Sequence, residues 1–258
     1  MIIAAEIGLS HDGSLGYCYA MAGAVACAGA TAVKFQCHDG DPNNSFRPGT
    51  FFQDRCRQNY WKRTAFTRSQ WMGLIEHCRG IGLLVGVTPF SIQAAHKLEG
   101  HIDYWKIGSG QTHDRELLQY VHGTAPVVVS TGLSDMAEAL RVREIVPGAT
   151  LLQCCTRYPT QPSEVGVNVM RSYGHPYGLS DHSGTIWPSI VAAWEGADMI
   201  EVHVVWDRDQ WGPDTKASIT VADLRQLVDG THFVGRMAPV EKNDQAAALE
   251  EARRLFRG

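Results

Sequence analysis

The sequence predicts a single-domain α/β protein of the (β/α)8, or TIM, barrel class across residues 1–258. Eight short apolar segments alternate with eight segments of helical periodicity, and no linker or low-complexity stretch divides the chain. The length of 258 residues also suits one barrel, which takes roughly 250 residues. Eight strand–helix units close naturally, because each crossover connection returns the next strand parallel to the last one.

The expected elements follow one another in strict alternation. Strands are expected at residues 2–8, 32–38, 83–89, 104–110, 126–132, 150–156, 177–182 and 199–205. Helices are expected at about 14–29, 68–81, 91–99, 113–122, 134–145, 163–173, 185–196 and 220–237. Two pieces lie outside this repeat: a long connection after the second strand, at about 38–67, and an extra C-terminal helix, at about 244–257. Long connections are uncommon unless they serve a site.

The composition argues against several classes of binding partner. The net charge is −4 and no basic run occurs, which argues against nucleic acid or an anionic membrane surface. No apolar run approaches the roughly 18 residues of a membrane span, and the start of the chain is typical of a strand, with no signal-peptide pattern. The seven cysteines lack a disulfide-framework spacing. We therefore expect reduced thiols in a cytoplasmic protein.

The interior of the predicted barrel is unusually polar. Side chains alternate along a strand, and the face that meets the helices should be apolar. This test turns the following side chains inward: Glu6, Lys34, Gln36, His38, Lys106, Ser130, Gln153, Ser180, His182, Glu201 and His203. Unpaired buried charges cost several kcal/mol each, so this set must either pair internally or hold a polar ligand. Most of it lies toward the C-terminal halves of the strands, where barrel active sites form.

The polar side chains in and around this interior fall into two sets with different chemistry. Cations and hydroxyls, which suit a phosphate or carboxylate ligand, are found at Lys34, Lys106, Ser109, Ser130, Thr156 and Ser180. Two imidazoles, His182 and His203, end the neighbouring seventh and eighth strands and suit a divalent metal, with Glu6 as a further ligand. The alternative for the two histidines is a pair of satisfied core residues.

Several motifs carry a resemblance to a known family. In order along the chain they are AEIGLSHDG (5–13), AVKFQ (32–36), TPF (88–90), KIGSG (106–110), VVSTG (128–132), YP (158–159), GLSDHS (178–183), EVH (201–203) and GPDTKAS (212–218). With these motifs the chain resembles the catalytic barrel of the sialic acid synthase (NeuB-like) family over roughly residues 2–235. The resemblance implies a TIM barrel that condenses phosphoenolpyruvate with an aldehyde, releases phosphate and leaves a 2-keto acid.

The resemblance also implies roles for individual residues. A divalent metal, most often Mn²⁺ with Mg²⁺ or Co²⁺ as alternatives, is expected at His182 and His203. The residues expected to bind phosphoenolpyruvate are Lys34, Thr88, Lys106, Ser109, Ser130, Thr156 and Ser180. Those expected on the acceptor side are Gln36, Tyr158, Asp214 and Lys216. The catalytic set implied by the motifs is Glu6, Lys106, Gln111, His182 and His203, with Glu6 suggested for proton transfer. A homodimer is expected by analogy.

Three departures from the family pattern concern the acceptor. Gln111 stands where the family has Glu, and Thr215 stands where it has His. The C-terminal antifreeze-like domain of full-length members is absent from these 258 residues. We therefore expect a different aldehyde, either an open-chain sugar or a nucleoside-derived aldehyde of specialised metabolism. Two other functions remain open: a pyruvate-type aldolase or lyase, and a non-catalytic paralogue that binds a ligand.

The aromatic residues at the barrel rim also allow two interpretations. The segment 46–61, together with Trp206 and Trp211, is rich in aromatic side chains. These side chains either form a lid over the site or pack on the rim of the barrel.

Overall fold

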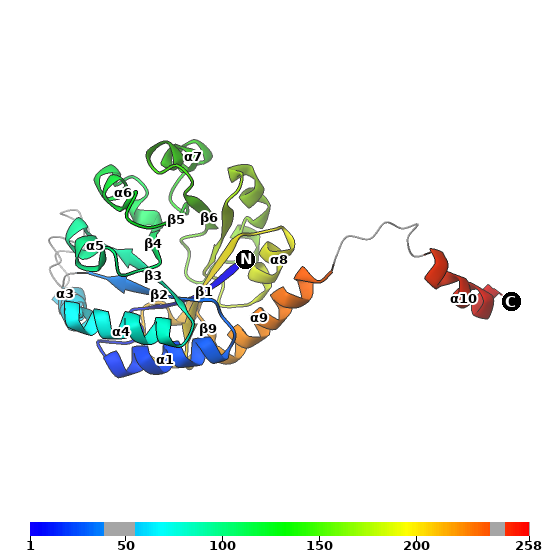
Figure 1. The fold of residues 1–258 in the computed structure, drawn as a ribbon, viewed down its shortest axis with the longest axis horizontal. Helices are drawn as coiled ribbons and strands as arrows, with labels where there is room; N and C mark the ends of the chain where they lie inside the picture. The colour runs from blue at the N-terminus through cyan, green and yellow to red at the C-terminus, as the bar shows by residue number, and fades with distance from the viewer. Residues whose placement is uncertain (39–54, 238–245, 258) are drawn as a thin grey trace.

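A closed barrel of eight parallel strands forms the centre of the molecule (Figure 1). The computed structural model describes residues 1–38, 55–237 and 246–257. The strands are β1 (Ile2–Gly8), β2 (Ala32–Cys37), β3 (Leu84–Pro89), β4 (Tyr104–Ile107), β5 (Val127–Ser130), β6 (Thr150–Cys154), β7 (Tyr177–Asp181) and β8 (Met199–Val205). Each pairs with the next, and β1 pairs with β8 through Ala5↔Val202, which closes the barrel. The predicted TIM barrel is confirmed. A short strand, β9 (Ile219–Thr220), adds to the end of β8.

Helices surround the strands. They are α1 (Leu15–Cys27), α4 (Arg68–Gly80), α5 (Ile92–Leu98), α6 (Arg115–Val121), α7 (Met136–Ile145), α8 (Trp187–Trp194) and α9 (Val221–Gly235). Most begin at a side chain that accepts a hydrogen bond from a backbone N–H of the first turn; these N-caps are Ser14, Thr67, Ser91, Asp114, Asp135 and Thr220. At these positions a local side-chain hydrogen bond therefore determines where the helix begins.

The structure differs from the predicted elements in two places. The helical segment expected at 163–173 forms two short 3-10 helices, η2 (Pro162–Glu164) and η3 (Val167–Tyr173). Gly166 separates them with a positive φ of 66°, which interrupts a continuous α-helix. The connection expected at 38–67 contains a helix, α3 (Arg55–Thr64), while residues 39–54 lie outside the described part. A helix also occurs near the C-terminus, α10 (Ala246–Arg257).

The barrel interior is divided into two layers. The layer near the N-terminal ends of the strands is apolar and consists of Ala4, Ala32, Tyr104, Val128, Leu152 and Met199. The charged and hydroxyl side chains lie beyond it, toward the C-terminal ends. Outward residues such as Val33, Phe35 and Ile200 pack instead against the helices. Apolar side chains thus fill the floor of the barrel, at the N-terminal ends of the strands, and the polar side chains lie at the C-terminal ends.

Tyr104 fills the barrel floor because Gly86 has no side chain. A Cβ on Gly86 would collide with the Tyr104 ring. We predict that Gly86→Ala destabilises the protein by about 1–3 kcal/mol, since overpacking forces a bulky buried ring to move. The control is Gly23→Ala in α1, where a Cβ meets no atom within 4 Å and stability should rise by up to about 1 kcal/mol. Urea unfolding measures both; equal stability of the two variants would contradict this packing.

His11 is a buried histidine in the turn after β1. Its ring stacks on Phe66 with centroids 4.8 Å apart, and its Nδ1 accepts a hydrogen bond from the Gly13 N–H at 3.0 Å. Burial lowers the pKa of His11 to about 4, and the nearby charge of Asp12 offsets only part of that effect. The imidazole is therefore neutral in the folded protein at pH 7.

This burial predicts a pH-dependent contribution to stability. Between pH 6.5 and 4 the unfolded chain binds a proton at His11 that the folded chain does not. The contribution is complete above pH 6.5 and is lost as the pH falls toward 4, by about 3 kcal/mol. Urea unfolding of His11→Asn should show a flatter pH profile in this window than the unsubstituted protein. The exposed His232→Gln should keep the original slope; an unchanged slope in His11→Asn would contradict the prediction.

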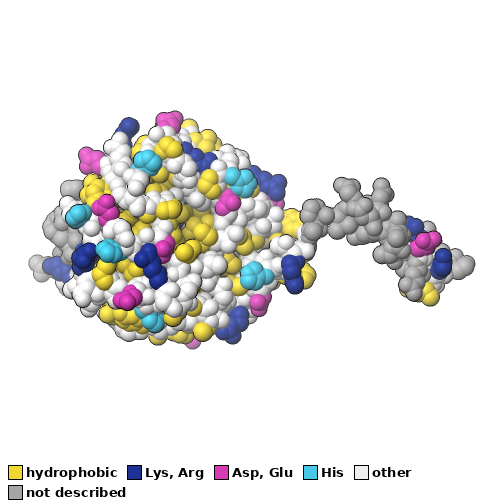
Figure 2. Space-filling model, viewed as in Figure 1, with side chains coloured by type: hydrophobic (Ala, Val, Ile, Leu, Met, Phe, Trp, Pro, Cys, Tyr) yellow, Lys and Arg dark blue, Asp and Glu magenta, His cyan; other side chains and the backbone are white. Residues whose placement is uncertain are grey.

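On the surface, basic and acidic side chains are interspersed on the face shown in Figure 2, and no single-sign patch covers it. No helix in the described part of the chain is long and apolar enough to cross a membrane.

Candidate active site

A cavity of about 220 Å³ opens at the C-terminal ends of the strands. Strands β2 to β8, or the turns that follow them, each contribute to its wall. Its lining residues are Lys34, Gln36, Thr88, Phe90, Lys106, Gly108, Ser109, Gly110, Ser130, Leu133, Cys154, Thr156, Tyr158, Ser180, His182, Glu201 and His203. This end of a barrel is where active sites form, because the loops that follow the strands converge there. All seven residues expected to bind phosphoenolpyruvate therefore line one cavity.

Lys34 lies in a buried network of charges at the base of the cavity. Its ammonium group forms an ion pair with Glu6 and lies 3.8 Å from the carboxylate of Glu201. It also donates a hydrogen bond to the Thr88 hydroxyl at 2.9 Å. Burial alone would lower the pKa of Lys34, but the carboxylates of Glu201 and Glu6 outweigh burial and raise it. Lys34 is therefore a fixed cation.

The charged form of Lys106 is stabilised less strongly than that of Lys34. Its Nζ donates a hydrogen bond to the Ser130 hydroxyl at 2.7 Å and lies 3.7 Å from Glu201. Burial lowers the pKa of Lys106, and the attraction of Glu201 compensates only in part. An anion beside this amine would favour its charged form. Lys106 is thus the cation of this cavity most responsive to an anionic ligand.

Glu201 connects the two lysines. Burial acts to raise its pKa, but Lys106 and Lys34 outweigh that effect and hold the pKa low. The carboxylate also accepts a hydrogen bond from the Ser180 hydroxyl at 3.3 Å. With Glu6, two carboxylates therefore balance two ammonium groups, and the network carries no net charge of its own.

The turns after β4 and β5 form a hydroxyl-lined wall. The Ser109 hydroxyl accepts a hydrogen bond from the Gly132 N–H at 3.0 Å. Gly132 has no Cβ because one would crowd both Ser109 and Thr156. Thr112 lies behind this wall and donates toward the carbonyl oxygens of Ser109 and Ser130, at 2.9 and 3.2 Å. Thr112 therefore supports the wall from outside the cavity.

Two histidines face each other at the ends of β7 and β8. The ring centroids of His182 and His203 are 5.2 Å apart. The carbonyl of Cys155, 2.8 Å from Nδ1 of His182, can only accept a hydrogen bond, so the proton is assigned to Nδ1. Burial, and secondarily the charge of His203, lowers the pKa of His182 to about 3. His182 is therefore neutral, and its unprotonated Nε2 can act as an acceptor or ligand.

These features fit a metal ion held by two imidazoles. A backbone carbonyl that orients the ring from Nδ1 is the usual support of a metal-binding histidine. Nε2 of His182 lies 2.8 Å from the Tyr158 hydroxyl, which an ion would replace as its partner. In the described part of the chain, no cluster of three or more His, Cys, Asp or Glu side chains forms a complete ligand set. Substrate oxygens or water would supply the remaining ligands.

The other predicted residues occupy different positions. Gln36 donates a hydrogen bond to Glu6 at 3.1 Å, and both side chains, together with Asp214, lie around Gly8. Asp214 also lies 3.9 Å from Nδ1 of His203. These polar groups, which were expected on the acceptor side or in proton transfer, therefore lie close together at one side of the cavity.

Four predicted residues are not among those that line the cavity: Glu6 and Asp214, which lie beside Gln36, and Gln111 and Lys216. The side-chain amide of Gln111 points to the Pro89 carbonyl, 3.2 Å from Nε2, and its buried Oε1 has no hydrogen-bond partner among the residues that the structure describes. Lys216, in the short helix η4 (Thr215–Ala217), is exposed. The structure brings neither Gln111 nor Lys216 to the cavity wall.

The inward direction predicted for Gln153 was wrong. Leu152 lies in the barrel interior and Cys154 lines the cavity, so the residue between them faces outward. There Gln153 bonds to the Val165 carbonyl and to the Tyr173 hydroxyl. Its neighbours Cys154 and Cys155 can lie on either face of the strand. The sequence pattern therefore did not determine which side chains of this strand point into the barrel. His38, also expected inside, contacts Thr64 instead.

Sequence reasoning also missed several residues of the site. Glu201 was turned inward by the strand pattern but received no role, although it contacts both lysines. Cys154 and Phe90 line the cavity without having been singled out for it. For Glu201 the signal was present, since a buried carboxylate in a strand that also carries His203 requires a cation.

Aromatic side chains pack at the rim, where a lid was one of two interpretations. Tyr60 of α3 meets Trp211 edge to face at 5.0 Å between ring centroids. The guanidinium of Arg63 lies over both rings and pairs with Asp12 at 2.7 Å. Trp206 is exposed. Helix α3, the turn after β1 and the segment after β8 are thereby joined at the mouth of the barrel.

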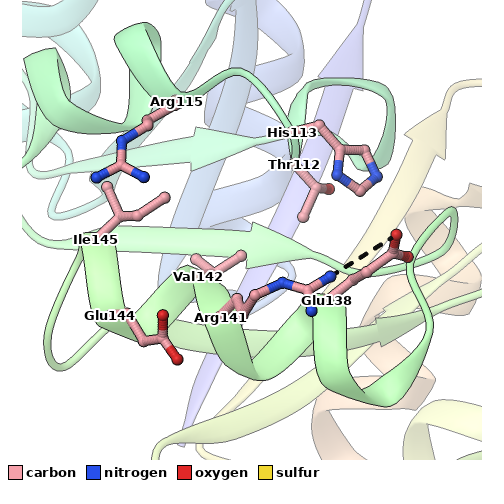
Figure 3. A pocket seen from close by; sticks show the side chains of 8 residues that line it. All are labelled: Thr112, His113, Arg115, Glu138, Arg141, Val142, Glu144 and Ile145. Atoms are coloured by element: carbon pink, nitrogen blue, oxygen red, sulfur yellow. Dashed lines mark ion pairs between the residues drawn. The ribbon is translucent and has the colours of Figure 1, made fainter.

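A second cavity, of about 250 Å³, lies between the start of α6 and α7 (Figure 3). Arg141 and Glu138 form an ion pair at 4.0 Å along its edge, and Arg115 and Glu144 approach from the sides. Its charges are mixed and solvent-exposed, which is typical of a surface hollow. It lies behind Thr112 and outside the barrel interior.

The chain is similar to several proteins named as sugar-acid synthases. It is 28% identical to human N-acetylneuraminate-9-phosphate synthase over 91% of this chain and 70% of that one. It is also 28% identical to Campylobacter jejuni N,N'-diacetyllegionaminic acid synthase over 88% of this chain and 74% of that one. The crystal structure of N-acetylneuraminic acid synthetase from Leptospira borgpetersenii, in complex with citrate, superimposes with a TM-score of 0.85 and 26% identity, covering 99% and 92% of the two chains.

The family assignment rests on most of the length of the barrel. The model of the NeuB family matches residues 21–241, from the first helix to beyond the last barrel helix. The chain belongs to the NeuB family, whose named relatives here are synthases.

Proposed function

We propose that this enzyme condenses phosphoenolpyruvate with an aldehyde and one water molecule, which adds at C2 of the donor, to give a 2-keto acid and inorganic phosphate. The observation that carries the proposal is the pair of buried lysines, flanked by hydroxyls, in one cavity with two histidines. Two cations with several hydroxyl donors suit a ligand that bears both a phosphate and a carboxylate. The named relatives make sugar acids, which fits an open-chain sugar as the aldehyde.

The donor half of the site would use Lys34 and Lys106 as its anchors. Lys34 is fixed by Glu6 and Thr88, whereas Lys106 responds to an incoming anion. Hydroxyls of Ser109, Ser130, Thr156 and Ser180, with Thr88, would complete the hydrogen bonds to the phosphate and carboxylate oxygens. Such contacts would hold the donor in a fixed position beside the acceptor half of the cavity.

The charge balance supports a metal ion at His182 and His203, with Mn²⁺ expected and Mg²⁺ or Co²⁺ as alternatives. The network of Lys34, Lys106, Glu6 and Glu201 is neutral, so a highly anionic donor requires an additional cation in the cavity. A bound divalent ion would supply that charge and polarise the aldehyde oxygen as a Lewis acid.

The acceptor half would lie where Gln36, Tyr158 and Asp214 approach the histidines. Gln36 lines the cavity and donates through its amide nitrogen to Glu6, and its carbonyl oxygen would accept a hydrogen bond from a substrate hydroxyl. Glu6 is buried next to Gln36 and Lys34, and we assign it the proton transfer at this side of the site. Gln111 does not replace such a carboxylate, because an amide cannot take up a proton.

The test is a product assay that separates the three functions considered. The purified enzyme is incubated with phosphoenolpyruvate, Mn²⁺ and a panel of open-chain sugars, including N-acetylmannosamine and its 6-phosphate, and with pyruvate in place of phosphoenolpyruvate. Release of inorganic phosphate that requires an aldehyde supports the synthase. Consumption of pyruvate without phosphate release would instead identify an aldolase or lyase, and ligand binding without turnover would identify a non-catalytic paralogue.

A further inference from the structure

The turn after β4 lies beyond the point where backbone pairing joins β4 to its neighbours. The last pair between β3 and β4 is Val87↔Trp105. The last pair between β4 and β5 is Ile107↔Val129. The turn that follows is a 3-10 helix, η1 (Ser109–Gln111), and two of its residues line the cavity. Contacts outside the sheet ladders therefore hold this turn against the neighbouring strands.

Gln111 connects the turn to the end of β3. Its Nε2 donates a hydrogen bond to the Pro89 carbonyl at 3.2 Å. Pro89 directly follows Thr88, whose hydroxyl lines the cavity and accepts a hydrogen bond from Lys34. A carbonyl oxygen can only accept, so an amide can make this contact and an ionised carboxylate cannot. Gln111 therefore fixes the end of β3 relative to the turn after β4.

Thr112 connects the same turn to the end of β5. Its side chain is buried, and its hydroxyl lies 2.9 Å from the Ser109 carbonyl and 3.2 Å from the Ser130 carbonyl. A second link runs beside it, because the Gly132 N–H donates to the Ser109 hydroxyl at 3.0 Å. The turn after β4 is thus tied to β3 by one neighbouring side chain and to β5 by the next.

A carboxylate at position 111 would disrupt these contacts. Nε2 of Gln111 faces the Pro89 carbonyl, and its Oε1 is buried. In Gln111→Glu both atoms become carboxylate oxygens, and one of them meets the lone pairs of that carbonyl. Burial without a hydrogen-bond donor strongly disfavours the ionised form. The turn would have to move in order to bring the new carboxylate to water.

We propose that Gln111 and Thr112 are positioning residues, which hold the hydroxyl groups of Thr88, Ser109 and Ser130 at fixed positions relative to one another. They act through the ends of β3, β4 and β5, and their own side chains do not line the cavity. The inference rests on the proposed function, because it assigns these three hydroxyls to the phosphoenolpyruvate site. It implies that this chain requires the amide at position 111. Gln111→Glu, which introduces the residue of the family pattern, should therefore weaken donor binding.

The experiment is isothermal titration of phosphoenolpyruvate, with Mn²⁺, into full-length variants. Gln111→Met and Thr112→Val each remove one donor at nearly constant size and should weaken affinity about 5- to 10-fold. Gln111→Glu should weaken it at least as much, whereas Thr112→Ser keeps the hydroxyl and should restore it. The matched controls are Gln93→Glu, at an exposed position of α5, and Thr231→Val, where a buried hydroxyl donates to a carbonyl within α9. Both controls should bind as the unsubstituted protein does.

Two further measurements separate positioning from general damage. Electron paramagnetic resonance should show unchanged Mn²⁺ binding in every variant. Hydrogen exchange over residues 108–113 and 130–134 should be faster in Gln111→Met and Thr112→Val than in the controls, because the turn and the end of β5 have lost a hydrogen bond. This exchange needs no ligand. An unsubstituted protein that binds no phosphoenolpyruvate would therefore contradict the proposed function, while the exchange rates still decide whether the two side chains fix the strand ends.

Three results would overturn the inference. Gln111→Glu that keeps its phosphoenolpyruvate affinity and condenses faster would assign position 111 to proton transfer. Thr112→Val with unchanged affinity and unchanged exchange would show that its hydroxyl fixes nothing. Loss of Mn²⁺ binding together with phosphoenolpyruvate binding would indicate damage to the whole barrel, which circular dichroism would also detect.

Discussion

Lys106→Met is expected to abolish phosphoenolpyruvate binding and to lower the rate of condensation by about 10²- to 10³-fold. Lys106 is buried, donates to Ser130 and faces Glu201. Methionine keeps most of the apolar stem but removes the cation, and loss of one partner from a buried charged contact costs about 3–5 kcal/mol. The donor then meets a network with one ammonium group and two carboxylates, which repels an anion.

The matched control is Lys216→Met, which removes a lysine that is exposed and outside the cavity. Phosphoenolpyruvate affinity in this variant should match that of the unsubstituted protein by isothermal titration. Thermal unfolding of both variants separates loss of binding from loss of folding. A Lys106→Met protein that remains folded and binds phosphoenolpyruvate normally would contradict the assignment of Lys106 to the donor.

His182→Gln and His203→Gln are expected to remove metal binding and to lower condensation by about 10³-fold. The two rings face each other, and His182 is neutral because burial lowers its pKa to about 3. Glutamine approximates the size of the side chain but lacks the imidazole ligand. Electron paramagnetic resonance of added Mn²⁺ measures binding directly. Phosphoenolpyruvate affinity in Mn²⁺ should fall to the value that the unsubstituted protein shows in EDTA.

The exposed His122→Gln is the control and should behave as the unsubstituted protein. If His182→Gln and His203→Gln bind Mn²⁺ as tightly as the control, the metal is not held by these two residues. Full activity of either variant in EDTA would argue against any requirement for the ion.

The strand pattern was sufficient to predict the barrel and most of its interior. Alternation along β2 placed Lys34 inside because Val33 and Phe35 had to face the helices. The same test gave the wrong direction for Gln153, because the neighbouring apolar and thiol side chains can lie on either face of the strand. The sequence also could not reveal that Glu201 balances two lysines from different strands, because that contact depends on the register between strands.

Loops were less predictable than strands. The departure at Gln111 was visible in the sequence, but its contact with the Pro89 carbonyl depends on how the turn after β4 folds into a 3-10 helix. Thr112 likewise supports Ser109 and Ser130 only because that turn brings it beneath them. Turn conformation is determined by contacts with distant segments, which local sequence patterns do not contain.

The most direct test of the donor site is isothermal titration of phosphoenolpyruvate into the purified protein, once with Mn²⁺ and once with EDTA. The account predicts saturable binding at one site per chain, on the order of micromolar with Mn²⁺ and weaker in EDTA, because the ion offsets the negative charge of the donor. A folded protein that takes up no phosphoenolpyruvate under either condition would contradict the account.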